Sequence, residues 1–226
     1  MSPVSLLKKI SLFEALSVQD REELAKILRY QTIRKGQILF RKGDEGTALY
    51  LIHTGRISII LTVRPDDEIT LAVLADGDFF GEMALLDGMA RSANAVAQED
   101  TELYVLNRID FIRFLMHNEH AMQAILYTLS MRLRKTDDLL GETAFLNISS
   151  RLAKRLVELA DTRGVREEGS THVELTLTQK ELASLVGVSR ESINKELKRW
   201  RARDLVATSR NRLIITDINA IRKRIR

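Results

Sequence analysis

The chain has 226 residues, enough for one large or two modest domains, and its 35 Lys+Arg and 31 Asp+Glu give a formal net charge of +4. It contains no cysteine, which excludes disulfides, iron–sulfur clusters and thiolate zinc sites. It also shows no basic-then-apolar leader pattern and no apolar run near the roughly 20 residues that span a bilayer, so we expect a cytoplasmic protein that does not contact a membrane.

Charge is distributed unevenly along the chain. Residues 1–146 carry 17 Lys+Arg against 21 Asp+Glu, a net −4, whereas residues 147–226 carry 18 against 10, a net +8. A basic C-terminal third on an acidic remainder indicates that one end of the molecule meets a polyanion. The alternative is a solvated basic surface, because charge alone does not identify a partner.

The N-terminal half of the chain predicts helices followed by a β-roll. Residues 5–30 are expected to be helical, with Ser17 as the N-cap of a segment that begins at Val18. Its apolar anchors are expected to be Leu6, Ile10, Leu24, Ile27 and Leu28. Short β runs separated by glycines then follow, a pattern typical of an antiparallel barrel or roll that can hold one small ligand. The runs are residues 38–40, 48–52, 56–63, 69–74, 92–97 and 101–106.

The stretch 79–93, FFGEMALLDGMARSA, interrupts the roll between its later strands. It predicts a short helix that opens on Gly81, a turn at Gly88, and a new strand that starts with Arg91. Free N–H groups at a helix start bind anions, and a glycine lets a phosphate approach the main chain closely. An Arg and a Ser can donate to that phosphate, and the Glu82 carboxylate can accept from ribose hydroxyls. This stretch therefore outlines a site for a phosphorylated sugar, with the expected ligands Gly81, Glu82, Met83, Ala84, Arg91 and Ser92.

A simpler reading of the same stretch is structural. Glu82 and Arg91 could form a semi-buried ion pair that braces the turn, with no ligand involved.

Two helices are predicted after the roll. Asn107 can cap a short helix that reaches Met116, and a longer helix covers residues 119–145. The longer helix has a regular seam at steps of four and three, namely Met122, Leu126, Leu129, Leu133, Thr136 and Leu140. Such a heptad seam requires a partner helix, and a parallel homodimer is the economical answer.

One position of this seam is polar. Thr136, together with Asp137 on the flank, could offer acceptors to an exocyclic base amine at the dimer contact. Alternatively, Thr136 sets the register of the two helices and Asp137 is a solvated charge.

The basic third predicts a winged helix-turn-helix. A helix with its apolar face at Ile148, Leu152, Leu156 and Leu159 ends near Gly164, a loop follows over 164–172, and 173–177 alternates as a strand. A capping box at Thr178 starts one short helix, Gly187 lies in the turn, and Ser189 caps a second helix. Residues 205–216, with 210–212 at the tip, are typical of a wing-like hairpin.

The second helix of this motif has two faces. Ile193, Leu197 and Trp200 share the face that we expect to be buried, which leaves the polar face free to enter a major groove. Arg and Lys can donate to guanine O6 and N7, and Glu can accept from cytosine N4. We expect Arg190, Glu191, Asn194 and Lys195 on the base-reading face, and Thr178, Ser189 and Lys198 at phosphates. Helical hairpins in ordinary cores share this spacing, so the motif alone is not decisive.

The stretch 79–93 also resembles the phosphate-binding cassette of cyclic-nucleotide-binding domains. In that family the amides and the Arg hold the cyclic phosphate, and the Glu holds the ribose 2′-hydroxyl. The resemblance further implies apolar walls beside the nucleotide at Ile59, Leu71 and Leu74. Each of these three residues is at least as easily explained as ordinary roll core.

Over its whole length the chain is similar to the cyclic-AMP receptor proteins of the CRP/FNR superfamily of bacterial transcription regulators. The resemblance is carried by residues 132–137 and 144–146 in the central helix and by 189–192 at the start of the recognition helix. It implies cyclic AMP, or cyclic GMP, as allosteric effector, contact of Thr136 with the base, a palindromic TGTGA-like DNA site and RNA polymerase as a partner. Two positions depart from the pattern: Asp137 replaces a Ser that reaches across the dimer, and Lys195 replaces an Arg.

The sequence therefore predicts an α+β chain in three parts: a cyclic-nucleotide-binding antiparallel β-roll (1–118), a dimerisation helix and hinge (119–146), and a winged helix-turn-helix domain (147–226). The four histidines are scattered, and no nucleophile elbow or Walker loop occurs, so we expect neither an enzyme nor a metal site. Two alternatives remain: the same fold responds to another effector or to none, or it is a cyclic-nucleotide-binding scaffold without a DNA function.

Overall fold

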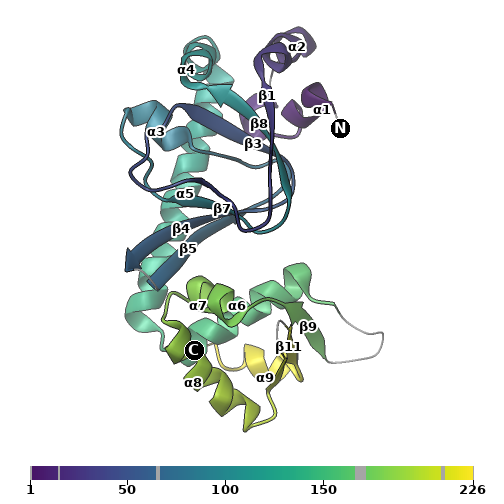
Figure 1. Ribbon diagram of the computed structural model, residues 1–226, viewed down its shortest axis with the longest axis vertical. Coiled ribbons are helices and arrows are strands. Elements are labelled where there is room, and N and C mark those ends of the chain that lie inside the picture. Colours follow the sequence, from purple (N-terminus) through teal and green to yellow (C-terminus); the bar gives the residue numbers. More distant parts are fainter. Residues whose placement is uncertain (1, 15, 65–66, 166–171, 210–211, 226) are drawn as a thin grey trace. The chain divides into compact units, whose positions relative to one another are not determined.

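The computed structural model describes residues 2–14, 16–64, 67–165, 172–209 and 212–225. The chain divides into two compact units (Figure 1). The first comprises Met1–Leu61 and Leu71–Lys135, and the second comprises Thr62–Thr70 and Thr136–Arg226.

The predicted N-terminal helical region consists of three short pieces. They are α1 (Pro3–Leu7), the 3-10 helix η1 (Ser11–Phe13) and α2 (Val18–Ile27). The prediction of Ser17 as N-cap is confirmed, because its hydroxyl oxygen accepts a hydrogen bond from the Asp20 N–H. Ile27 was wrongly expected to be an anchor and is 43% exposed, since Leu28, one turn after Leu24, packs against the core instead.

Two antiparallel four-stranded sheets build the predicted roll. One has the order β1 (Arg29–Ile33), β8 (Thr101–Asn107), β3 (Ala48–Thr54), β6 (Phe79–Phe80). The other has the order β2 (Ile38–Phe40), β7 (Asn94–Ala97), β4 (Ile57–Arg64), β5 (Asp67–Leu74). The paired strands run antiparallel, as in β3 with β8 and β4 with β7, which confirms the expected architecture.

Strand β6, only two residues long, was not predicted, and two further details of the roll differ from the sequence prediction. Strand β1 was missed because only Ile33 of its five residues is buried, so the apolar alternation that marks a strand is absent. Strand β7 begins at Asn94 rather than Ser92, because the Arg91 N–H bonds to the Asp44 carbonyl (2.8 Å) and ties this segment to the β2–β3 loop.

The first unit has two apolar clusters. Ile52, Ile57, Phe80 and Leu103 pack with others inside the roll. A second cluster joins the helices α1, α2, α4 (Arg108–Met116) and the start of α5 (Glu119–Phe145) to the sheet of β3 and β8, and Figure 1 shows α1, α2 and α4 gathered beside these strands. The first half of α5 is thereby fixed to the roll.

The second unit contains the end of α5 and the predicted winged helix-turn-helix. Its elements are α6 (Ile148–Arg163), β9 (Val173–Thr176), α7 (Gln179–Val186), α8 (Arg190–Arg201), β10 (Val206–Ser209), β11 (Arg212–Ile215) and α9 (Ile218–Arg222). The strands form an antiparallel sheet in the order β10-β11-β9, and α7 lies beside α8 in Figure 1. Helix α9 was not predicted. Residues 166–171 of the predicted loop and 210–211 of the predicted wing tip lie outside the described residues.

A single apolar core holds this unit together. Trp200 of α8 is fully buried among side chains from α6, α7 and the sheet, including Leu156, Leu182 and Leu213. Across the ranges that the structure describes, no helix is both long and apolar enough to cross a membrane.

Candidate functional sites

The helix of the predicted cassette begins where the sequence indicated. Helix α3 (Glu82–Asp87) follows Gly81, which has φ 87°, and ends at Gly88, which has φ 73°. A Cβ atom on Gly81 would lie 2.6 Å from Arg91 Nη1. Glycine is therefore required at position 81 both by the left-handed backbone and by the close approach of Arg91.

Arg91 packs against the strands of the roll. Its side chain is almost completely buried, with Nη1 donating to the Gly81 carbonyl (2.8 Å) and Nη2 to the Ala48 carbonyl (2.7 Å). The guanidinium carbon lies 4.3 Å from the centre of the Phe40 ring, a cation–π contact. Burial lowers the pKa of Arg91, and its Nε is buried without a hydrogen-bond partner among the described residues.

Glu82 is held by a residue that the sequence interpretation did not assign to the pocket. The Glu82 carboxylate is 1% exposed, and its Oε1 accepts a hydrogen bond from Arg132 Nη1 at 2.5 Å. Arg132 also donates from Nη2 to the Phe79 carbonyl (2.6 Å). Glu82 Oε2 is buried and has no hydrogen-bond partner in the described part of the chain. The carboxylate is thus paired with α5, in place of the Glu82–Arg91 pair considered above.

These side chains surround one small cavity of about 60 Å³. All six residues expected from the cassette line it, together with Phe40, Ile59, Phe80, Ala93 and Arg132. The Ser92 hydroxyl donates to Met83 Sδ at 3.8 Å. Of the three apolar walls implied by the resemblance, only Ile59 is among these lining residues, since Leu71 is 39% exposed and Leu74 packs in the roll core.

The two remaining expected ligands lie further along α5. Thr136 and Asp137 are exposed, belong to the second unit, and are not among the residues that line the cavity. The seam itself is exposed at several positions, with Leu126 57%, Leu133 63% and Leu140 69% accessible. Helix α5 therefore carries an apolar stripe that its own chain leaves uncovered.

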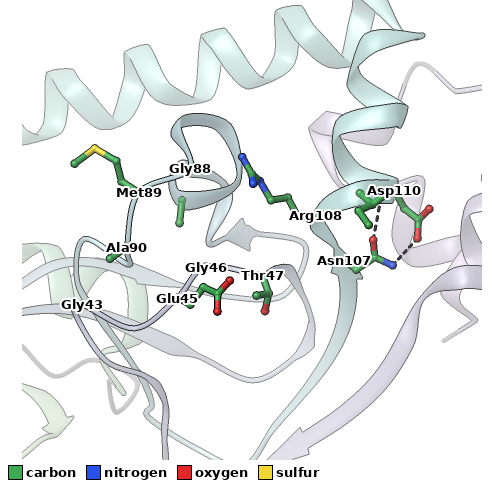
Figure 2. A pocket seen from close by; sticks show the side chains of 12 residues that line it. Gly43, Glu45, Gly46, Thr47, Gly88, Met89, Ala90, Asn107, Arg108 and Asp110 are labelled. Carbon is green, nitrogen blue, oxygen red and sulfur yellow. Dashed lines mark hydrogen bonds between the residues drawn. The ribbon is translucent and has the colours of Figure 1, made fainter.

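A larger hollow of about 700 Å³ lies beside the same helix α3 (Figure 2). It is lined by the β2–β3 loop, the end of α3 and the start of α4, and only Ala84 is shared with the smaller cavity. Its polar groups serve the fold: Asn107 and Asp110 bond to each other at the start of α4, and Arg108 donates to the Leu85 carbonyl (3.1 Å). With Glu45 and Asp110 in its lining, this hollow is poorly suited to an anion.

The helix-turn-helix is built by local signals. Thr178 and Glu181 form the predicted capping box on α7, with the Thr178 N–H donating to Glu181 Oε2 (2.6 Å) and the Glu181 N–H donating to Thr178 Oγ1 (3.1 Å). Gly187 ends α7 with φ 69°, and the Ser189 hydroxyl caps α8 by accepting from the Ser192 N–H (3.2 Å). The turn therefore has the geometry that the sequence predicted.

The outer face of α8 is polar and accessible. Arg190, Glu191, Lys195 and Lys198 are exposed, and Asn194 is half-buried. Glu191 accepts from Lys195 at 2.8 Å, and this contact lowers the pKa of Glu191. The Asn194 Oδ1 atom is buried and unpartnered within the described residues. This face can donate and accept at base edges once the Glu191–Lys195 pair opens.

One buried polar contact behind α8 was not predicted. Trp200 Nε1 donates to Glu196 Oε1 (2.8 Å) and lies 3.2 Å from Ser149 Oγ on α6. Glu196 is 8% exposed. Glu196 lies four residues before Trp200 on the buried face, and this spacing is the only sequence signal for the contact.

Two family models match the chain in the order of these two sites. The cyclic nucleotide-binding domain model matches residues 30–118, and the Crp-like helix-turn-helix domain model matches residues 150–224. The chain is therefore a DNA-binding transcription regulator that carries a cyclic-nucleotide-binding domain. In the described residues no group of three His, Asp or Glu side chains gathers to hold a metal ion.

Comparison of the whole chain gives the family. Over 191 residues, 84% of this chain and 85% of the relative, it is 33% identical to the cyclic AMP receptor protein of Thermus thermophilus. Over 221 residues, 98% of this chain and 99% of the relative, it is 28% identical to the CRP-like cAMP-activated global transcriptional regulator of Mycobacterium tuberculosis. A solved structure of the c-di-GMP-responsive global regulator of Xanthomonas campestris shares the fold, with a TM-score of 0.77 and 24% identity, covering 88% of this chain and 99% of that one. The chain belongs to the CRP/FNR superfamily of transcription regulators.

Proposed function

We propose that this protein is a homodimer whose DNA binding is controlled by a cyclic nucleotide, cyclic AMP in the first place and cyclic GMP in the second. The observation that carries the proposal is a pair of buried polar atoms on cavity-lining residues, the Arg91 Nε donor and the Glu82 Oε2 acceptor, for which the described part of the chain supplies no hydrogen-bond partner. A phosphorylated sugar supplies an acceptor for the first and a hydroxyl donor for the second. An apolar effector would leave both unsatisfied, at about 1–3 kcal/mol each.

Each residue of the pocket has a defined part in this proposal. The amides of residues 81–84, the Ser92 hydroxyl and Arg91 bind the cyclic phosphate, and Glu82 binds the ribose 2′-hydroxyl while Arg132 holds its other oxygen. The cavity of about 60 Å³ must widen, because sites for ligands of this size are of the order of 300–1,000 Å³. Met83, which is 46% exposed, can move aside while Arg132 keeps its bond to Glu82.

The base is read by α5 in the dimer. Thr136 and Asp137 accept hydrogen bonds from the exocyclic amine of adenine, with Asp137 contributed by the partner subunit. The exposed apolar stripe at Leu126, Leu133 and Leu140 supports a partner helix here. In the competing assignment, Thr136 sets the register of the two helices and Asp137 is a solvated charge. Measurement of cyclic AMP binding by the Thr136→Ala and Asp137→Ala variants separates the two: ligand contact predicts weaker binding, and the competing assignment predicts unchanged affinity.

The DNA site follows from the exposed face of α8. Arg190, Glu191, Asn194 and Lys195 read bases of a TGTGA-like half-site, while Thr178, Ser189 and Lys198 contact phosphates. A two-fold dimer requires a palindromic site with half-sites about 34 Å apart. Lys195 lacks the planar fork of Arg, so preference at its base is looser.

The partners follow from this assignment. As a regulator of transcription the protein works in the cytoplasm on double-stranded DNA and meets RNA polymerase there, and we expect no enzymatic activity. The competing function keeps the fold and changes the effector, or dispenses with it, and the c-di-GMP-responsive relative is the observation that favours keeping this alternative.

Calorimetry of the purified protein with cyclic AMP and cyclic GMP tests the proposal. We expect saturable binding, tighter for cyclic AMP, together with tighter binding of a palindromic TGTGA-like duplex when the nucleotide is present. If neither nucleotide binds, the competing function takes its place, and cyclic di-GMP is the next ligand to titrate.

A further inference from the structure

A partly buried cluster of charges lies where α5 ends and α6 passes behind the helix-turn-helix. Glu142, in the last turn of α5, has a side chain that is 10% exposed. Its Oε1 accepts from Lys154 Nζ (2.6 Å), and its Oε2 accepts from Arg155 Nη2 (3.0 Å). Carboxylates are rarely buried without a partner, and here each oxygen has a cation from α6. We call Glu142, Lys154, Arg155 and Arg151 the hinge cluster.

Arg155 connects Glu142 to the helix-turn-helix. Its three nitrogens address three acceptors: Nη2 donates to Glu142, Nη1 donates to Glu158 on the same helix (2.6 Å), and Nε donates to the Leu185 carbonyl (3.1 Å). Leu185 lies in the last turn of α7, where carbonyls have no partner within the helix. Because the guanidinium is planar and rigid, one side chain fixes the end of α5 relative to the end of α7.

Arg151 makes the cluster dependent on the Glu142 charge. It lies one turn before Arg155, is 8% exposed, and its Nε and Nη1 have no hydrogen-bond partner in the described residues. Burial lowers the pKa of Arg151, and the Glu142 carboxylate opposes this effect. Without that carboxylate, a desolvated cation would remain in the second unit.

We propose that Glu142 is a positioning residue that sets the angle between the dimerisation helix and the helix-turn-helix, and so the separation of the two recognition helices in the dimer. The inference rests on the proposed function, since it needs a dimer that reads a palindrome. In a two-fold dimer both subunits share the α5 contact, so the joint at the end of each α5 determines how far apart the two copies of α8 lie. A rigid joint penalises palindromes whose half-sites have the wrong spacing.

The test compares Glu142→Gln with Glu158→Gln. Both variants remove a carboxylate from Arg155, but Glu158 is on the same helix as Arg155 and is 45% exposed, so it does not connect two elements. Fluorescence anisotropy measures the Kd for palindromes with the optimal spacer, for palindromes with the spacer changed by one or two base pairs, and for an isolated half-site. We expect Glu142→Gln to reduce the discrimination between spacers about tenfold with half-site affinity unchanged, and Glu158→Gln to behave as the wild type.

The inference is overturned if folded Glu142→Gln discriminates between spacers as well as the wild type does. It is also overturned if the variant loses half-site affinity as much as palindrome affinity, because Glu142 would then only stabilise the helix-turn-helix. If Glu142→Gln does not fold, Arg155→Lys replaces it: this variant keeps a charge near Glu142 but loses the fork to Leu185, and unchanged discrimination again refutes the inference. A wild type that binds half-sites without preference for any palindrome refutes the proposed dimeric function, and the hinge role with it.

Discussion

Replacement of Arg91 by Leu separates the two tasks of this side chain. In the folded protein, Arg91 donates to the Gly81 and Ala48 carbonyls and lies over the Phe40 ring. In the proposed complex, Arg91 supplies a charged donor to the nucleotide. Among the described residues that line the cavity, Arg132 is the other one with a charged donor. Leucine fills part of the space and contacts the same ring, but it donates nothing.

The substitution has one cost for effector binding and a separate cost for folding. Loss of a hydrogen bond to a charged phosphate costs about 1.5–3 kcal/mol, which corresponds to roughly 10- to 150-fold weaker nucleotide binding. Two carbonyls are left unsatisfied in the variant, at about 1–3 kcal/mol each. Burial of an apolar group in place of a desolvated cation offsets much of this, so we expect net destabilisation of about 2 kcal/mol or less.

Calorimetry with cyclic AMP and thermal unfolding of the same preparations measure both quantities. Arg108→Leu is the matched control, because Arg108 also donates to a carbonyl next to the cassette, that of Leu85, but lines the larger hollow instead of the small cavity. Arg91→Leu should lose nucleotide-dependent DNA binding and retain weak, salt-sensitive binding, while Arg108→Leu keeps the nucleotide response. Normal cyclic AMP affinity in folded Arg91→Leu would show that the cassette does not bind phosphate.

Four further changes test other parts of the structure. Gly81→Ala places a Cβ 2.6 Å from Arg91 Nη1 at a left-handed φ, so nucleotide affinity should fall at least about tenfold by calorimetry, and wild-type affinity would contradict the close approach. Glu191→Ala should relax base preference in anisotropy across half-site variants, and an unchanged preference would remove Glu191 from direct readout. Lys195 holds the pKa of Glu191 below its ordinary value, so the ion pair is present at neutral pH and is lost as pH falls through that lowered pKa. In Lys195→Met, carboxyl NMR should show the pKa of Glu191 rising towards its ordinary value. Gly187→Ala, at φ 69°, should lower the free energy of unfolding by about 1–2 kcal/mol in a thermal melt, and no change would mean that the turn tolerates a side chain.

The features that sequence predicted well depend on neighbours in the chain. The capping box at Thr178, the glycine at 187 and the start of α3 at Gly81 each need a residue type fixed by local backbone geometry. All six cassette residues meet at one cavity because they lie within a single turn–helix–turn segment. Such signals are visible in a short window of sequence.

The features that sequence missed depend on how elements pack. Arg132 is 50 residues from Glu82 and lies between seam positions of α5, so nothing local indicates that it holds the carboxylate. In the sequence, Glu196 resembles an ordinary solvated charge. Only the packing of α6 against α8, with Ser149 near Trp200 Nε1, shows that Glu196 accepts from Trp200 in a buried contact. The expected wall at Leu71 fails for the same reason, since alternation identifies the strand but not which face the cavity uses.

Arg91 and Glu82 form hydrogen bonds within their own chain, and these bonds also affect how tightly the pocket binds its effector. Under the proposed function, an incoming anion would compete with the Ala48 and Gly81 carbonyls for Arg91, and a ribose hydroxyl would share Glu82 with Arg132. The concentration at which the effector registers is therefore governed by the strength of these internal contacts as well as by those to the ligand itself. Substitutions next to Ala48 in strand β3 can therefore change the response to the effector without altering a residue that lines the cavity.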